Sequence, residues 1–148
     1  MTIKARSEFS YPEESPGFLL WQVSNLWQKL QRKALSQLNL THVQFALLSG
    51  IGCLETQQGT VNQTDLSRHV GADVMMTSQV LRTLETKGLV KRHREPSDPR
   101  AFSLSLTEEG RSVTKKAVKI VENVDFAFFL KSLKNKEKLM SLLKELSS

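Results

Sequence analysis

Basic side chains gather in one short segment of the chain, where Lys91, Arg92, Arg94 and Arg100 accompany two carboxylates, Glu95 and Asp98. Guanidinium and ammonium groups bind phosphates, and arginine also enters narrow minor grooves, so this segment could bind a nucleic acid. The carboxylate of Asp98 could hold the guanidinium of Arg100 in place before binding. A basic run alone is usually a solvated surface, so the interpretation depends on the elements that position it.

The segment before these charges, residues 73–88, is predicted to form an amphipathic helix. Thr77, Val80, Leu81 and Leu84 recur at i, i+3, i+4 and i+7, which places them on one buried face. The opposite face suits the major groove, because glutamine pairs with adenine and arginine pairs with guanine or phosphate. The residues predicted to contact bases from this face are Met75, Met76, Ser78, Gln79, Arg82 and Thr83.

Met75 and Met76 have two interpretations on such a helix. Either side chain could contact thymine methyl groups in the major groove, or it could pack under the preceding helix. The sequence leaves both alternatives open for both residues.

A shorter helix is predicted immediately upstream. Asn62 is a good N-cap, and Val70-Gly71 ends the apolar pattern. The first residues of this helix, Asn62, Gln63 and Thr64, are predicted to contact phosphates, because a helix N-terminus attracts anions.

A β-hairpin is predicted to follow the second of these helices. Strands are expected at residues 89–95 and 101–106, with a turn at residues 96–99 that contains two prolines. Two short helices, a tight turn and a hairpin are the parts of a winged helix-turn-helix, which binds duplex DNA through its second helix.

Both ends of the chain are more apolar than one subunit is expected to bury. Leu20, Val23 and Trp27 follow coiled-coil spacing, and Leu19 with Leu26 adds a second apolar edge. A helix buried on two sides in a small protein often has a neighbour from another subunit, so a homodimer is expected. The predicted organisation is a flexible arm (1–15), a dimerisation helix (16–38), the winged helix-turn-helix domain (39–110) and C-terminal dimerisation helices (111–148).

Four short motifs occur, in this order, between residues 65 and 110. They are Asp65-Leu66-Ser67, residues 84–92 (LETKGLVKR), Asp98-Pro99-Arg100-Ala101 and residues 106–110 (LTEEG). In this order and spacing they resemble the MarR family of bacterial transcriptional regulators, and with the flanking helices the resemblance covers roughly residues 17–147.

The resemblance implies a mainly α-helical fold in which four helices, a two-stranded wing and two further helices follow one another. It also implies a homodimer with both chain ends intertwined about a two-fold axis, bound to a pseudo-palindromic operator and usually acting as a repressor. Many members release DNA when a small aromatic or phenolic effector binds. Trp27 and His42 are the candidate effector-pocket residues, although tryptophans at helical spacing, here Trp21 and Trp27, are more often core, and we prefer that interpretation.

Composition sets limits on the function. The 148 residues carry a net charge of +6, yet residues 56–111 hold eight basic and seven acidic side chains, so local placement matters more than total charge. No apolar run approaches the ~20 residues of a membrane span, so we expect no membrane partner and a location in the bacterial cytosol, at the nucleoid. No catalytic arrangement, cofactor motif or metal-ligand cluster is recognised, so neither an enzyme nor a cofactor is predicted.

Two other functions remain open at this point. Winged helices can bind a protein partner with the same surface, although the basic hairpin argues against it. Cys53, the only cysteine, could make the chain an oxidant-sensing regulator. We prefer a structural role for Cys53, because cysteine is a common buried residue.

Overall fold

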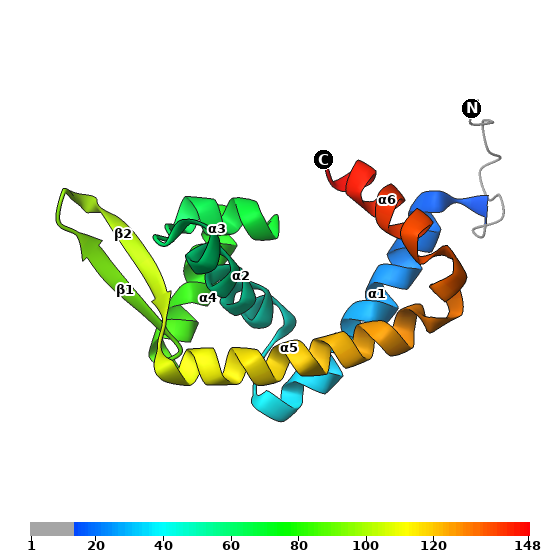
Figure 1. Cartoon of the computed structure of the whole chain (residues 1–148), viewed down its shortest axis with the longest axis horizontal. Coiled ribbons are helices and arrows are strands. Elements are labelled where there is room, and N and C mark those ends of the chain that lie inside the picture. Colours follow the sequence, from blue (N-terminus) through cyan, green and yellow to red (C-terminus); the bar gives the residue numbers. More distant parts are fainter. Residues whose placement is uncertain (1–13) are drawn as a thin grey trace.

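In residues 14–148, which the structure describes, six α-helices and one β-hairpin follow one another in the predicted order. The computed structural model describes residues 14–148, except for the side chains of residues 99–101, so most of the arm predicted at residues 1–15 lies outside it. Near one end of the long helix α5 lie α2, α3, α4 and the hairpin, and near its other end lie α6 and the start of α1 (Figure 1). The elements are α1 (Pro16–Leu35), η2 (Ser36–Leu38), α2 (His42–Gln58), α3 (Gln63–Val70), α4 (Val74–Thr86), β1 (Val90–Glu95), β2 (Asp98–Leu106), α5 (Glu108–Phe129), η3 (Leu130–Asn135) and α6 (Lys136–Ser147).

Four helices begin at side-chain caps, and the cap predicted above, Asn62, is confirmed. At α2 the Thr41 hydroxyl accepts from the backbone N–H of Gln44, and the Gln44 side chain accepts from the backbone N–H of Thr41. Asn62, Asp73 and Thr107 each accept a backbone N–H three residues further on, at 2.8, 3.0 and 2.9 Å. Each cap satisfies an N–H that the first turn of a helix leaves without a partner, which fixes where α2, α3, α4 and α5 begin.

The main core lies between α2, α3, α4 and the base of the hairpin. Thr77, Leu81 and Leu84 of α4 have no exposed surface, which confirms the buried face predicted for this helix. Val80 is half-buried and packs against the same cluster. The fully buried apolar partners on the neighbouring elements include Leu47, Leu48, Ile51, Val61 and Leu66.

The two strands are antiparallel, and their register changes near the tip. Pairing is regular as far as Arg94 opposite Phe102, after which Glu95 pairs with Asp98. The strand β2 therefore begins at Asp98 rather than at residue 101, and the connecting turn is shorter than predicted. Pro99 has no N–H to donate to the ladder, and the irregular register accommodates it.

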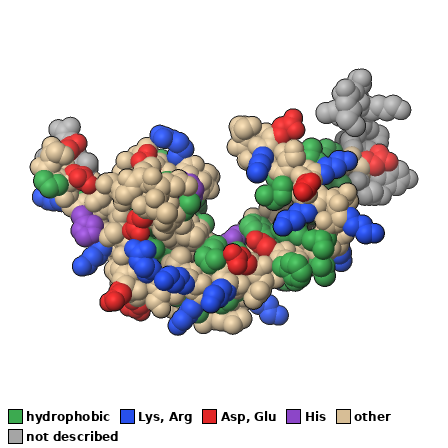
Figure 2. Space-filling view, in the orientation of Figure 1, with side chains coloured by type: hydrophobic (Ala, Val, Ile, Leu, Met, Phe, Trp, Pro, Cys, Tyr) green, Lys and Arg blue, Asp and Glu red, His purple; other side chains and the backbone are tan. Residues whose placement is uncertain are grey.

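Apolar side chains are exposed at the end of the molecule formed by α1, η3 and α6, where Figure 2 shows green side chains gathered. Trp21 is 67% exposed, so the prediction that it belongs to the core is wrong for a single subunit. The reason is that no described element of this chain covers that face of α1. The other large apolar residues exposed on these elements and on the end of α5 are Phe18, Leu19, Leu20, Val23, Leu26, Leu30, Phe126, Leu130, Leu133, Met140, Leu142, Leu143 and Leu146.

The start of α5 lies directly against the backbone that enters β1. A Cβ atom at Gly110 would collide with the carbonyl group of Leu89, and the same carbonyl accepts from the backbone N–H of Thr107 at 3.0 Å. Only glycine allows this approach, so Gly110 fixes how closely α5 meets the base of the hairpin.

We expect Gly110→Ala to lower the free energy of unfolding by about 1–3 kcal/mol, because the added methyl group must displace the backbone of residue 89. Urea unfolding followed by circular dichroism measures this change. Gly52→Ala is the matched control: its Cβ would lie 3.6 Å from Leu106 Cδ1, an ordinary contact, inside the helix α2. The control should be unchanged or more stable by up to about 1 kcal/mol, because alanine is the better helix former. Equal stability of Gly110→Ala and wild type would contradict the packing described.

Candidate nucleic-acid interface

The face of α4 opposite the core is open to solvent. Met75 is 81% exposed, which excludes packing beneath α3, and Met76, Gln79, Arg82 and Thr83 are exposed as well. Ser78 is half-buried on the same face. Five of the six predicted base-contacting residues line one shallow depression: Met75, Met76, Ser78, Gln79 and Arg82. Asp73 lines the same depression. The structure thus brings this predicted set together on one accessible surface.

At the start of α3, two of the three predicted phosphate contacts also hold the motif together. The Asn62 side-chain oxygen caps the helix at Asp65, and the Gln63 amide donates to the carbonyl of Val74 at 3.4 Å. The second bond ties the first turn of α3 to the first turn of α4. Thr64 is exposed beside them, so its hydroxyl is accessible to a phosphate.

The basic residues of the hairpin divide into two groups. Lys91 and Arg94 are exposed on β1. Arg92 instead is half-buried: its Nε lies 3.3 Å from Glu85 Oε1 of α4, and its guanidinium lies over the Phe102 ring, 5.3 Å from the centroid. This arginine joins the hairpin to α4, a role that the charge pattern did not predict. Asp98 is exposed, whereas the Arg100 side chain, and with it the predicted pairing of the two, lies outside the described side chains.

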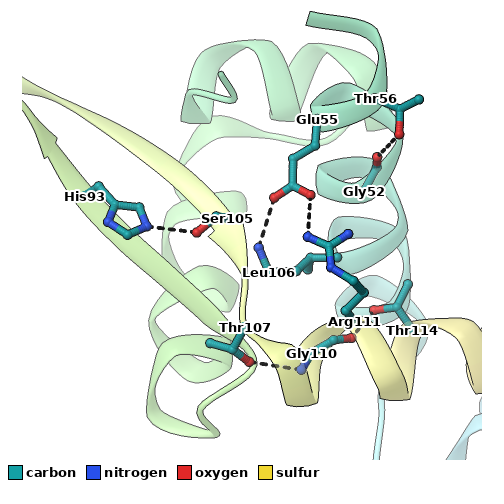
Figure 3. A network of polar contacts seen from close by, with 10 residues as sticks. All are labelled: Gly52, Glu55, Thr56, His93, Ser105, Leu106, Thr107, Gly110, Arg111 and Thr114. Atoms are coloured by element: carbon teal, nitrogen blue, oxygen red, sulfur yellow. Dashed lines mark hydrogen bonds and ion pairs between the residues drawn. The ribbon is translucent and has the colours of Figure 1, made fainter. Parts of the chain in front are cut away.

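A carboxylate that sequence reasoning missed attaches the hairpin to the rest of the domain (Figure 3). Glu55 of α2 accepts from the backbone N–H of Leu106 at 3.1 Å and forms an ion pair with Arg111 of α5 at 2.9 Å. Nearby, the backbone N–H of Leu104 donates to the carbonyl of Val61 at 2.7 Å. The inner end of β2 is thus bonded to α2 and to the segment that connects α2 with α3. No sequence signal marks Glu55, because its partners are more than fifty residues away.

Trp27 and His42, the candidate effector-pocket residues, meet where α1, α2 and α5 converge. Their rings are in edge-to-face contact with centroids 4.9 Å apart. Asp125 Oδ1 accepts from the Trp27 indole N–H at 2.7 Å and from the Gln31 amide at 2.8 Å. Gln31 is fully buried, and its amide oxygen has no hydrogen-bond partner within the described residues. The cluster connects the helices at the chain ends to the helix that precedes the helix-turn-helix.

Known proteins resemble this chain in sequence and in fold. The model of the MarR family matches residues 40–102. An uncharacterized HTH-type transcriptional regulator of Bacillus subtilis, YdcH, is 46% identical over 140 residues, which cover 95% of each chain. The chain belongs to the MarR family of transcriptional regulators. As a family member it is a DNA-binding regulator of transcription, not an enzyme.

Other relatives extend the likeness to this MarR-family chain. The HTH-type transcriptional repressor Rv2887 of Mycobacterium tuberculosis is 31% identical over 109 residues, 74% of this chain and 76% of that one. The crystal structure of a mutant of Escherichia coli MarR in complex with operator DNA is 25% identical, with a TM-score of 0.80 over 90% of this chain and 95% of that chain. The winged helix-turn-helix fold predicted from the sequence is thereby confirmed.

Cys53 is exposed on α2, so the expectation of a buried cysteine is wrong. Its sulfur accepts a hydrogen bond from the Gln57 amide one helical turn away, at 3.5 Å. Among residues 14–148, no group of three His, Cys, Asp or Glu side chains is placed to hold a metal ion. None of the helices in that range has the length and apolarity needed to cross a membrane.

The environment of His42 predicts a pH dependence of stability. Burial lowers the pKa of His42 from its ordinary value of 6.5; Asp125 opposes this shift, and Arg32 adds to it. Well above pH 6.5 the imidazole is neutral in both folded and unfolded states. As the pH falls below that value, the unfolded chain takes up the proton first, so the free energy of unfolding decreases.

We therefore expect His42→Gln to lose less stability than wild type between about pH 8 and pH 5, because it removes this titration. Urea unfolding across that range measures the slope. Above about pH 7.5 the difference in stability between variant and wild type should be constant, which serves as the internal control. Identical slopes for the two proteins would show that His42 does not titrate differently on folding.

Proposed function

We propose that this regulator is a repressor that binds a pseudo-palindromic operator as a homodimer. The observation that carries the proposal is α4, which buries one face in the core and exposes a row of polar and apolar side chains on the other. An α-helix of this kind fits the major groove, and the exposed Lys91 and Arg94 of the hairpin lie on the strand that follows. In the proposal, residues 39–110 form the DNA-binding part, Arg100 enters the minor groove beside Asp98, and Thr64 contacts phosphate.

The apolar surface of α1, η3 and α6 supports a second copy of the chain as the partner at that end. The end of α5, η3 and α6 form an apolar groove of about 410 Å³ lined by Phe126, Phe129, Leu133 and Met140, among others. A two-fold dimer built from residues 16–38 and 111–148 presents two copies of α4. Recognition helices about 34–36 Å apart contact successive major grooves on one side of a duplex, which gives the operator its two-fold symmetry.

A small aromatic or phenolic effector is proposed at the convergence of α1, α2 and α5. Trp27 and His42 supply aromatic surface there, and the buried amide oxygen of Gln31 can accept a hydroxyl hydrogen. The site joins the proposed dimerisation helices to α2, so a ligand that favours one arrangement of these helices changes the spacing of the two α4 helices. The regulator would act in the bacterial cytosol on DNA of the nucleoid.

Replacing Arg82 tests the DNA contact. We expect Arg82→Ala to weaken binding to a duplex selected from a random pool by about 1–3 kcal/mol, because a guanidinium contact to base or phosphate is lost. The same loss is expected of Arg100→Ala. Fluorescence anisotropy at two salt concentrations measures affinity, and affinity should fall steeply with salt. Lys131→Ala, an exposed basic residue at the distant end of the molecule, is the control. Unchanged affinity in Arg82→Ala would remove α4 from the interface, and absence of duplex binding at low salt would favour a protein-interaction module.

Replacing Leu20 tests the dimer. We expect Leu20→Glu to convert the dimer to a monomer in sedimentation experiments and to weaken operator binding, because it places a charge on the apolar surface of α1. Gln22→Glu adds the same charge at an already polar, exposed position nearby and should leave the dimer intact. If wild type sediments as a monomer at concentrations that saturate the operator, the homodimer is excluded.

A further inference from the structure

The first turn of α4 exposes three consecutive apolar side chains. Val74 is 53% exposed, Met75 81% and Met76 40%, although other apolar residues of this helix are buried or half-buried. Within the described residues nothing covers this apolar turn. Adjacent apolar groups left uncovered on a surface mark a contact site, and this one belongs to the face that carries Gln79 and Arg82.

The position of this apolar turn at the start of α4 indicates which chemical group of DNA it contacts. The N-terminal residues of a recognition helix are those that contact base edges, and the apolar group that the base pairs present in the major groove is the methyl group of thymine. We infer that Met75 contacts a thymine methyl group and thereby specifies thymine at one position of each half-site. This inference rests on the proposed binding of duplex DNA by α4.

The charge at this end of α4 favours base edges over phosphates. The carboxylate of Asp73 lines the same depression as Met75 and accepts from the backbone N–H of Met76 at 3.0 Å. A negative charge beside Met75 repels phosphate groups, so this turn fits the floor of the groove rather than the DNA backbone. Arg82, a cationic side chain on the same face of α4, lies two turns further along the helix.

The backbone under Met75 is held from several sides. Besides the Asp73 cap, the Thr77 hydroxyl donates to the carbonyl of Asp73 at 2.8 Å, and the Gln63 amide donates to the carbonyl of Val74 at 3.4 Å. The position of the Met75 Cα atom is therefore fixed, while its unbranched thioether side chain can adapt to the shape of a methyl group. A fixed backbone makes contact with one base position reproducible.

The spacing along α4 relates this thymine to a second base. Met75 and Gln79 lie four residues apart, about 6 Å along the helix axis. Base pairs are about 3.4 Å apart, so the two side chains reach positions about two base pairs from one another. Because glutamine suits adenine, each half-site should carry an adenine about two base pairs from the thymine.

The test removes only the methyl group of thymine from the duplex. A duplex selected from a random pool by the full-length protein is resynthesised with single thymines replaced by 2′-deoxyuridine, which keeps every hydrogen-bonding group. At one position per half-site, we expect wild-type affinity to fall about fourfold for each methyl group lost. The Met75→Ala variant should bind the thymine and uracil duplexes equally well, and Met75→Leu, which keeps an apolar side chain, should retain the preference.

The possible outcomes separate this inference from the proposed function. If no duplex is bound by the wild type, the proposed function fails, and the inference fails with it. If the selected duplex is bound tightly but no thymine position is sensitive to uracil, the inference alone is overturned. The same holds if the sensitivity persists in Met75→Ala, because another residue then contacts the methyl group. Met75 is exposed, and circular dichroism of Met75→Ala should match that of wild type.

Discussion

The burial of one face of α4 is the constraint on which the rest of the interface depends. Leu81 and Leu84 have no exposed surface, and Thr77 beside them is equally buried. Rotation of α4 about its axis would bring polar side chains into the core and leucines into water, which costs several kcal/mol. The same packing that stabilises the domain therefore determines which residues face outward, and the row from Met75 to Arg82 is presented as a consequence.

Ion pairs and a hydrogen bond between different elements then fix the hairpin relative to α4. Arg92 pairs with Glu85 of α4, and Glu55 of α2 bonds both to β2 and to Arg111 of α5. Gly110 lets α5 approach the same region closely. Charged residues of this protein thus serve two purposes: some remain exposed where a polyanion can meet them, and others, partly buried, hold the elements at a fixed angle.

At the other end of the molecule, the apolar surface exceeds what residues 14–148 of one chain cover. Trp21 and its neighbours on α1 are exposed, and so are Leu142, Leu143 and Leu146 of α6. Between this end and the helix-turn-helix lies the cluster of Trp27, His42 and Asp125, in which α1, α2 and α5 touch. A change in packing at the proposed dimerisation end would be transmitted to α2 through this contact, which is why we propose the effector site at this cluster.

The sequence by itself determined the helix starts, the buried face of α4 and the family, because caps, apolar periodicity and short motifs are local signals. It also predicted which face of α4 points away from the core, since the opposite face follows from helical geometry, but it left open whether Met75 packs under the preceding helix. Only the tertiary structure decided that Arg92 joins β1 to α4, that Glu55 attaches the hairpin, and that Met75 is open to solvent. The Glu55 contacts join segments more than fifty residues apart, and the Arg92 contact joins a strand to the helix before it. A local pattern carries no information about which side chain of another element completes a bond or covers a surface.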